Sequence, residues 1–183
     1  MFTTSNIALK KIFVDGFYRI HAGMLVFIFV ILISYCLFIN TLGTVRPEQI
    51  DFWQFFFTIS IVSNPLILTF YLVGSTLYAY KSLKYVLDQM ALPQQEFLFY
   101  SFTASARKSQ FKRWVMVYSY IFLPVLSYTL YALTIGLVFG FYIISIGILL
   151  FQLLLIAGSA YICLKENNRL VEVNKSSWLI RIT

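Results

Sequence analysis

The stretch that decides the fold runs from Trp114 to Leu164 and reads WVMVYSYIFLPVLSYTLYALTIGLVFGFYIISIGILLFQLLLIAGSAYICL. It contains no Asp, Glu, Lys, Arg or His. The hydrocarbon core of a bilayer is about 30 Å thick, and about 20 apolar residues of helix cross it. The stretch is therefore long enough to cross twice, and it predicts a membrane protein rather than a soluble one.

The composition of the whole chain also favours a membrane location. Of its 183 residues, 60% are hydrophobic and 11% are charged, whereas about 25% of the residues of a soluble domain carry a charge. The net charge is +7, which in a soluble protein would suggest nucleic acid as a partner. Here the basic residues flank apolar segments, which indicates anionic lipid headgroups instead. We expect no nucleic-acid partner.

Two more uncharged windows precede the long one, so the expected fold class is an all-α polytopic membrane protein with four transmembrane helices. The predicted spans cover residues 22–42, 56–79, 115–132 and 141–163. A turn is expected between the last two, at about 134–140. The alternative for the long stretch is one long span followed by a re-entrant segment. The domains are then a cytoplasmic amphipathic helix at 1–21, a four-span domain at 22–164 with a helical loop at 80–113, and a tail at 165–183.

The distribution of basic residues sets the predicted orientation. Every Lys and Arg except Arg46 precedes the first span, follows the last span or lies in the loop 80–113. Loops on the cytoplasmic side are rich in Lys and Arg. We therefore expect both termini in the cytoplasm, and we expect the protein to be integral to the bacterial inner (plasma) membrane.

Two cytoplasmic segments have an amphipathic pattern. Residues 5–20 predict a helix that is either a surface for a cytoplasmic partner or a simple membrane anchor. In the loop, span two is expected to continue as a helix to Met90, and a second helix is expected over 94–113 after a break. The basic residues at the end of this second helix could bind either a partner protein or lipid headgroups. The candidate docking residues are Phe13, Phe17, Arg19, Leu92, Pro93, Glu96 and Phe97.

The spans themselves carry little chemistry. An ionisable residue inside a membrane suggests a functional site, and the interiors of these spans have none. The single histidine, His21, lies at the edge of span one. Cys36 and Cys163 are predicted near opposite membrane faces and so cannot pair within one chain. We expect no catalytic, cofactor or metal site, and no enzyme activity.

Polar residues and prolines inside the spans have two interpretations. Polar side chains bond between membrane helices, and a proline frees a carbonyl that neighbouring groups then satisfy. These positions either hold helices together or line a path for a hydrophobic or amphipathic substrate. The candidates are Asn64, Pro65, Pro124, Tyr128 and Gln152.

The segment Met90–Phe97, MALPQQEF, is similar to the Leu-Pro-x-x-x-Glu-like start of the coupling loop in type-2 ABC exporter permeases. The layout also resembles that family in its first amphipathic helix, its helical loop between spans two and three, and its minimal turn between spans three and four. The family has six spans, whereas four are predicted here. The resemblance implies a permease-like subunit whose first helix and loop contact a cytoplasmic ATPase, with two or more copies forming the path.

Three functional classes follow. The first is a transmembrane subunit of a multi-protein export system, in which any ATP chemistry belongs to a partner because the chain has no Walker motif. The second is a non-catalytic structural or assembly subunit of a larger membrane complex. The third, an integral-membrane lipid enzyme, is disfavoured by the lack of titratable groups. The expected partners are membrane lipids, other membrane subunits or a second copy, and the ATPase.

Overall fold

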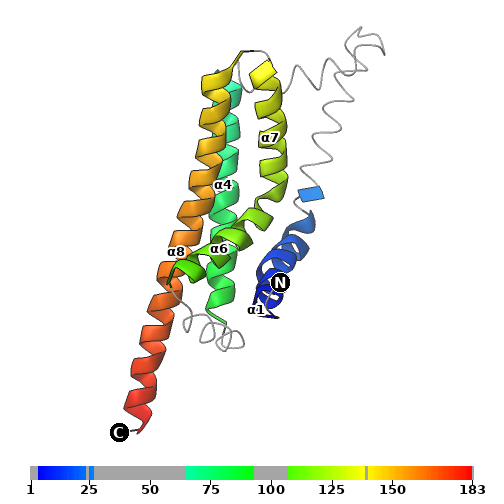
Figure 1. Cartoon of the computed structure of the whole chain (residues 1–183). Helices are drawn as coiled ribbons and strands as arrows, with labels where there is room; N and C mark the ends of the chain where they lie inside the picture. The colour runs from blue at the N-terminus through cyan, green and yellow to red at the C-terminus, as the bar shows by residue number, and fades with distance from the viewer. Residues whose placement is uncertain (1–3, 24, 27–64, 93–106, 139, 183) are drawn as a thin grey trace. The chain divides into compact units, whose positions relative to one another are not determined.

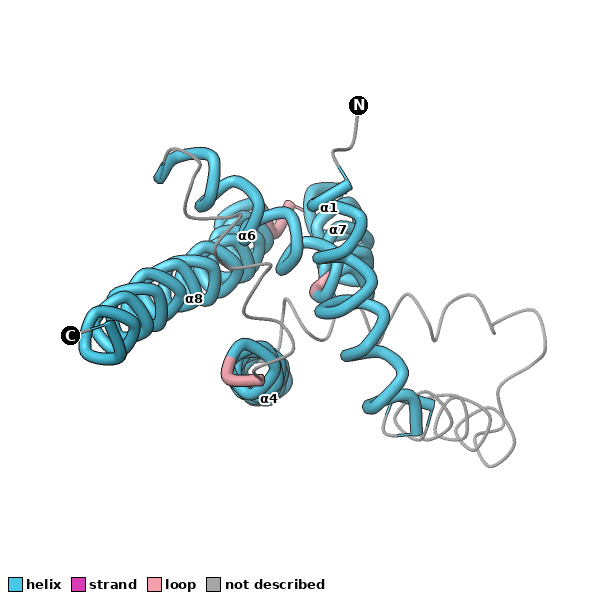
Figure 2. Tube along the Cα trace, turned by 90° about the horizontal axis from the view of Figure 1, so that it is seen from below, coloured by secondary structure: helices cyan, strands magenta, loops and turns pink. Residues whose placement is uncertain are grey.

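The computed structural model describes residues 4–23, 25–26, 65–92, 107–138 and 140–182. These residues form helices joined by turns and contain no strand (Figure 2). The all-α part of the predicted fold class is therefore confirmed for them. The helices are α1 (Thr4–Leu9), the π-helix η1 (Lys10–Asp15), α4 (Pro65–Met90), α6 (Arg107–Ile121), α7 (Leu123–Val138) and α8 (Tyr142–Ile182). Figure 1 labels the five α-helices.

One helix of the described part, α8, is long and apolar enough to cross a membrane, over Tyr142–Glu172. Helix α7 has 16 residues, fewer than the about 20 that a crossing needs. Most of the predicted first span, and the start of the second, lie outside the described residues. The described residues thus contain one candidate span.

The N-terminal segment, predicted as an amphipathic helix over 5–20, is helical and contains a π-helical stretch. It is helical from residue 4 to residue 23, but its middle, Lys10–Asp15, is π-helical. A π-helical stretch replaces i−4 hydrogen bonds by i−5 bonds and is common at functional positions. The sequence pattern gave no sign of it, because hydrophobic spacing does not distinguish the two bonding patterns over one turn.

Helix α4 continues beyond the predicted span two and ends at Met90, as expected. Its last turn closes through the Ala91 N–H, which donates to the Leu87 carbonyl at 3.1 Å. Pro93 follows shortly, and a proline disfavours helical backbone at the residue before it. The chain therefore leaves the helix at the position that the proline predicts.

The predicted span 115–132 is not one helix. Helix α6 ends at Ile121 and α7 begins at Leu123, with a turn at Phe122. Pro124 explains the break, because it has no N–H and its ring excludes the carbonyl four residues earlier from helical geometry. Proline is tolerated in the first turn of a helix, so a new helix begins there. Within the predicted span, two helices therefore meet at this proline.

A tight turn joins α7 to α8 where the sequence predicts one. The Phe141 N–H donates to the Gly136 carbonyl at 2.8 Å, and Gly140 has a φ of 84°. Helix α7 runs to Val138, so the turn occupies only the end of the predicted range. Helix α8 then continues without interruption for 41 residues, and the predicted tail 165–183 is part of it up to Ile182.

Replacing Gly140 by alanine is expected to destabilise the fold by about 1–2 kcal/mol, because a Cβ disfavours left-handed backbone by that amount. Thermal unfolding of the purified variant measures the loss. Gly147→Ala is the control, since a Cβ at this helical position meets nothing within 4 Å. Equal unfolding temperatures for the two variants would contradict the assigned turn.

The chain divides into two compact units. Unit 1 contains Met1–Phe17, Thr76–Leu123 and Leu153–Thr183, and unit 2 contains Tyr18–Ser75 and Pro124–Gln152. In unit 1 the N-terminal helix packs on α4 and α6 through buried aromatic rings. In unit 2 the first part of α4 packs on α7 and on the first part of α8 through polar side chains.

Candidate functional site

A polar cluster, formed by Tyr71, Ser75, Thr129 and Gln152, links the three helices of unit 2. The Gln152 Nε2 donates to the Ser75 Oγ at 2.8 Å, which joins α8 to α4. The Tyr71 hydroxyl lies 2.6 Å from the Thr129 Oγ1, which joins α4 to α7. Two of the four side chains, those of Gln152 and Thr129, are almost completely buried, at 0% and 1% exposure.

The direction of the second hydrogen bond follows from the inventory of donors. The Thr129 hydroxyl donates to the Val125 carbonyl at 2.7 Å, and a hydroxyl has only one proton to donate. The Tyr71 hydroxyl must therefore be the donor to Thr129. This arrangement fixes the tyrosine as a neutral phenol with its proton pointing to α7.

Two buried side-chain oxygens of α8 have no hydrogen-bond partner among the described residues. They are the Gln152 Oε1 and the Ser145 Oγ, both on α8 and seven residues apart, so they share one helix face. A buried acceptor left without a partner costs about 1–3 kcal/mol. The interior of unit 2 therefore retains hydrogen-bonding capacity that its own side chains do not use.

The outer surface of unit 2 carries large apolar side chains, whereas its interior contains the polar cluster. Ile143 is 88% exposed, and Phe70 and Val138 also present most of their surface. A soluble domain normally buries such side chains and exposes serine and glutamine. The helices of unit 2 have the opposite arrangement.

The structure brings together two of the five residues predicted as path or packing positions. Gln152 belongs to the polar cluster, and the Tyr128 ring lies 6.0 Å from the Tyr71 ring, centroid to centroid. Pro124 is exposed at the start of α7. Pro65 is the first residue of α4, and its carbonyl oxygen accepts a hydrogen bond from the Thr69 hydroxyl at 2.8 Å. Asn64 lies outside the described residues.

Tyr71 and Thr129 were missed by the sequence interpretation. Both are single polar residues in apolar runs, and such residues are common on helices. The available signal was spacing: Tyr71 and Ser75 are one helical turn apart and so share a face. The partner helix could not be inferred without the tertiary structure.

A second group of side chains, the aromatic cluster, lies inside unit 1. It is built around the N-terminal helix, whose rings meet those of α4 and α6 edge to face. The centroid distances are 5.3 Å for Phe13–Trp114, 5.7 Å for Phe17–Tyr78, 5.6 Å for Phe17–Tyr85 and 5.2 Å for Tyr78–Phe122. Edge-to-face pairs contribute about 0.5–1.5 kcal/mol each beyond the area that they bury.

Two hydrogen bonds accompany the rings. The Tyr85 hydroxyl donates to the Ile12 carbonyl at 3.2 Å, within the π-helical stretch, and the Tyr78 hydroxyl donates to the Ile121 carbonyl at 2.7 Å. Burial raises the pKa of Tyr85. Tyr85 therefore keeps its proton at neutral pH and can continue to donate to Ile12.

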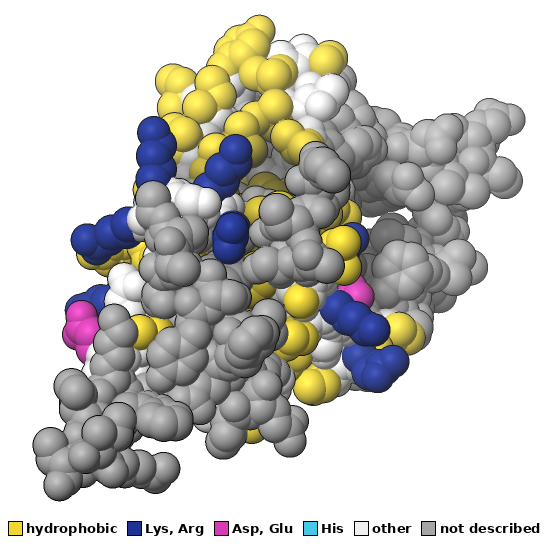
Figure 3. All heavy atoms as spheres, turned by 60° about the horizontal axis from the view of Figure 1, so that its bottom comes forward, with side chains coloured by type: hydrophobic (Ala, Val, Ile, Leu, Met, Phe, Trp, Pro, Cys, Tyr) yellow, Lys and Arg dark blue, Asp and Glu magenta, His cyan; other side chains and the backbone are white. Residues whose placement is uncertain are grey.

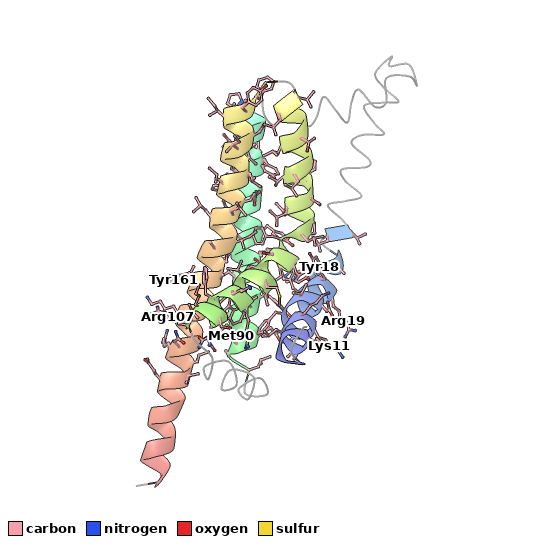
Figure 4. The ribbon with its side chains drawn as sticks, viewed as in Figure 1. Lys11, Tyr18, Arg19, Met90, Arg107 and Tyr161 are labelled. Carbon is pink, nitrogen blue, oxygen red and sulfur yellow. The ribbon has the colours of Figure 1, made fainter. Side chains whose placement is uncertain are left out.

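The predicted docking residues differ in their exposure. Phe13 and Phe17 have no exposed surface, so their rings contact this chain and are not available to a partner as it stands. Arg19 is exposed on the N-terminal helix (Figure 4), and Leu92 is exposed after α4. Pro93, Glu96 and Phe97 lie outside the described residues.

In the described part of the chain no three His, Cys, Asp or Glu side chains form a group that could hold a metal ion.

No family model, curated protein or solved structure matches this chain. The functional argument therefore rests on its own residues.

The close approach of Gly16 to Tyr85 provides a direct test of the aromatic cluster. A Cβ on residue 16 would overlap the Tyr85 hydroxyl. We expect Gly16→Ala to destabilise the protein by about 1–3 kcal/mol, as overpacking does, and to break the bond to Ile12. Thermal unfolding in detergent measures the effect.

Two further variants serve as controls for Gly16→Ala: an alanine substitution at another glycine, and a second substitution that should restore the lost stability. Gly23→Ala should be harmless, because nothing lies within 4 Å of a Cβ there. Adding Tyr85→Phe to Gly16→Ala removes the overlapping oxygen and should restore most of the lost stability. A double variant as unstable as Gly16→Ala alone would contradict this packing.

Proposed function

We propose that the chain is a transmembrane subunit of a multi-protein export system in the bacterial inner membrane, with four spans and both termini in the cytoplasm. A cytoplasmic ATPase partner would drive it. The observation that carries the membrane part is the reversed distribution of polarity in unit 2. Gln152 is completely buried, whereas Ile143 is 88% exposed, and hydrocarbon rather than water is the solvent that such a surface fits.

The order of residues along the helices supports the proposed orientation. Exposed Leu77 and Tyr80 on α4 are followed by Lys81 and Lys84, so this helix is apolar first and basic afterwards. Helix α6 has the reverse order, since it begins at Arg107. A helix that enters the cytoplasm ends on basic residues and one that leaves it begins on them. Helix α4 and the segment formed by α6 and α7 therefore fit opposite directions of crossing.

Reporter fusions test the orientation. An enzyme that is active only outside the membrane should be active when fused after Gln49 and silent when fused after Ala104. A second reporter that works only in the cytoplasm is the control, because it should give the opposite pattern and show that both fusions are made. The reverse result at both positions would contradict the proposed topology.

The surface that remains for an ATPase is smaller than the sequence suggests. With Phe13 and Phe17 buried, the exposed candidates among the described residues are Arg19 and Leu92. Purification in mild detergent, followed by mass spectrometry, tests the partner. A stoichiometric ATPase that is lost in an Arg19→Ala/Leu92→Ala variant supports coupling, and Arg169→Ala, at an exposed arginine of α8, is the control for a change in surface charge alone.

The second candidate function is a structural or assembly subunit. The specific observation in its favour is that the polar cluster and the aromatic cluster both hold the chain's own helices together. Recovery of other membrane subunits without an ATPase would favour this function over export. If Glu96→Ala/Phe97→Ala stops transport while assembly persists, export is the better account.

A further inference from the structure

One face of α8 carries three exposed side chains, which are aliphatic, aromatic and cationic in that order along the helix. Leu154 is 70% exposed and Tyr161 is 54% exposed, and Lys165 is also exposed. The residues are seven and four positions apart, so they lie on the same face of the helix. The order along the face is aliphatic, aromatic, cationic.

Helix α4 repeats the order independently. Leu77 and Tyr80 are exposed, at 60% and 63%, and Lys84 is exposed one turn after Tyr80. The tyrosine and the lysine are again four positions apart. Figure 3 shows Lys and Arg side chains bordering the exposed apolar side chains. We call these two sets of three residues the α8 ladder and the α4 ladder.

The lysines of both ladders have charge available for a ligand. Neither Lys84 nor Lys165 forms an ion pair with another of the described residues. Arg169, by contrast, lies 3.5 Å from the Glu166 carboxylate. An external anion can therefore reach the lysine that lies one helical turn after the exposed tyrosine in each ladder.

We propose that Lys84 and Lys165 each bind the phosphate of an anionic phospholipid. Tyr80 and Tyr161 then lie at the level of the glycerol and ester groups, where aromatic residues are enriched. Leu77 and Leu154 lie along the acyl chains. The proposal rests on the membrane location proposed above, and it adds two lipid sites to it.

The dimensions of the α8 ladder fit one lipid leaflet. At about 1.5 Å of rise per residue, Lys165 lies about 6 Å beyond Tyr161 and about 16 Å beyond Leu154. Half of the hydrocarbon core is about 15 Å thick. An acidic protein surface could also attract the lysines, but it gives no reason for an exposed leucine and tyrosine on the same face, so the ladders favour a lipid.

The test compares two variants with equal loss of charge. Lys84→Gln/Lys165→Gln removes both proposed phosphate ligands, and Lys108→Gln/Lys112→Gln removes two exposed lysines of α6 that follow no exposed tyrosine among the described residues. Native mass spectrometry measures the binding of phosphatidylglycerol and of phosphatidylcholine to each purified full-length protein. A lysine near an anionic surface contributes about 1 kcal/mol, so we expect about fivefold weaker phosphatidylglycerol binding at each altered ladder.

The expected result is weaker phosphatidylglycerol binding by the ladder variant alone, with phosphatidylcholine binding unchanged in both. Equal weakening in the two variants would overturn the proposal, because it would mean diffuse attraction rather than two sites. Inorganic phosphate at the same concentration should not displace the lipid. Displacement would also overturn the proposal, because it would indicate a site for free phosphate.

A separate measurement distinguishes failure of the lipid sites from failure of the proposed function. Both variants and the natural protein should stay in the membrane during alkaline carbonate extraction. Release of the natural protein would contradict integral membrane location itself. Retention of all three proteins together with unselective lipid binding would contradict only the two sites.

Discussion

Replacing Trp114 by alanine is expected to destabilise the protein by about 3–5 kcal/mol, the range for removing a large buried aromatic side chain. Trp114 is completely buried and its ring lies 5.3 Å from that of Phe13. The variant therefore loses a ring contact that joins the N-terminal helix to α6. Thermal unfolding in detergent measures the loss, and limited proteolysis should show earlier cleavage in the first 20 residues.

Two further variants make the Trp114 result specific. Trp114→Phe keeps an aromatic ring against Phe13 and should lose much less stability. Phe70→Ala removes a ring that is 76% exposed, so it should change the unfolding temperature little. If Trp114→Ala behaved like Phe70→Ala, the packing of the N-terminal helix described above would be wrong.

Replacing Gln152 by glutamate is expected to have the second large effect, and the effect should depend on pH. The substitution places a carboxyl group of nearly the same shape next to Ser75, in a completely buried position. An ionised residue at the centre of a membrane helix costs about 2.5–3.5 kcal/mol on insertion scales. Burial disfavours the charged form and so raises the pKa of the new carboxyl group.

The sign of the pH dependence follows from that raised pKa. The unfolded glutamate ionises near pH 4.3, as in peptides, while the folded one keeps its proton to higher pH. The variant should be close to the natural protein below about pH 4 and should lose stability as the pH rises above that value. Unfolding temperatures across pH 4–8 measure this, with Gln89→Glu, beyond the predicted span, as the control. A pH-independent Gln152→Glu variant would indicate that water reaches residue 152.

The helices that the sequence predicted well are those whose ends are marked by local chemistry. The run that ends at Met90 precedes Pro93, and the turn before α8 contains Gly140, whose φ of 84° suits glycine. These signals act over a few residues, so they can be read from the sequence. The break at Phe122 was also marked, by Pro124, a proline that the sequence interpretation singled out within span three.

The candidate site was less predictable because it depends on which helices meet. Gln152 stood out as a polar residue in an apolar run, but its partner Ser75 is 77 positions away in the chain. Phe13 and Phe17 formed an apolar face, and an apolar face fits a membrane, a partner or the chain's own helices equally well. Only the tertiary contacts with Tyr78 and Trp114 decide among these.

The unbroken course of α8 has a mechanical consequence. Its 41 residues correspond to about 60 Å at about 1.5 Å per residue, twice the thickness of the hydrocarbon core. The helix contains no proline, the usual cause of a sharp kink, so it acts as a lever. In the proposed membrane location, a tilt of one end of α8 would displace its other end, so a force applied outside the bilayer would reach the segment inside it.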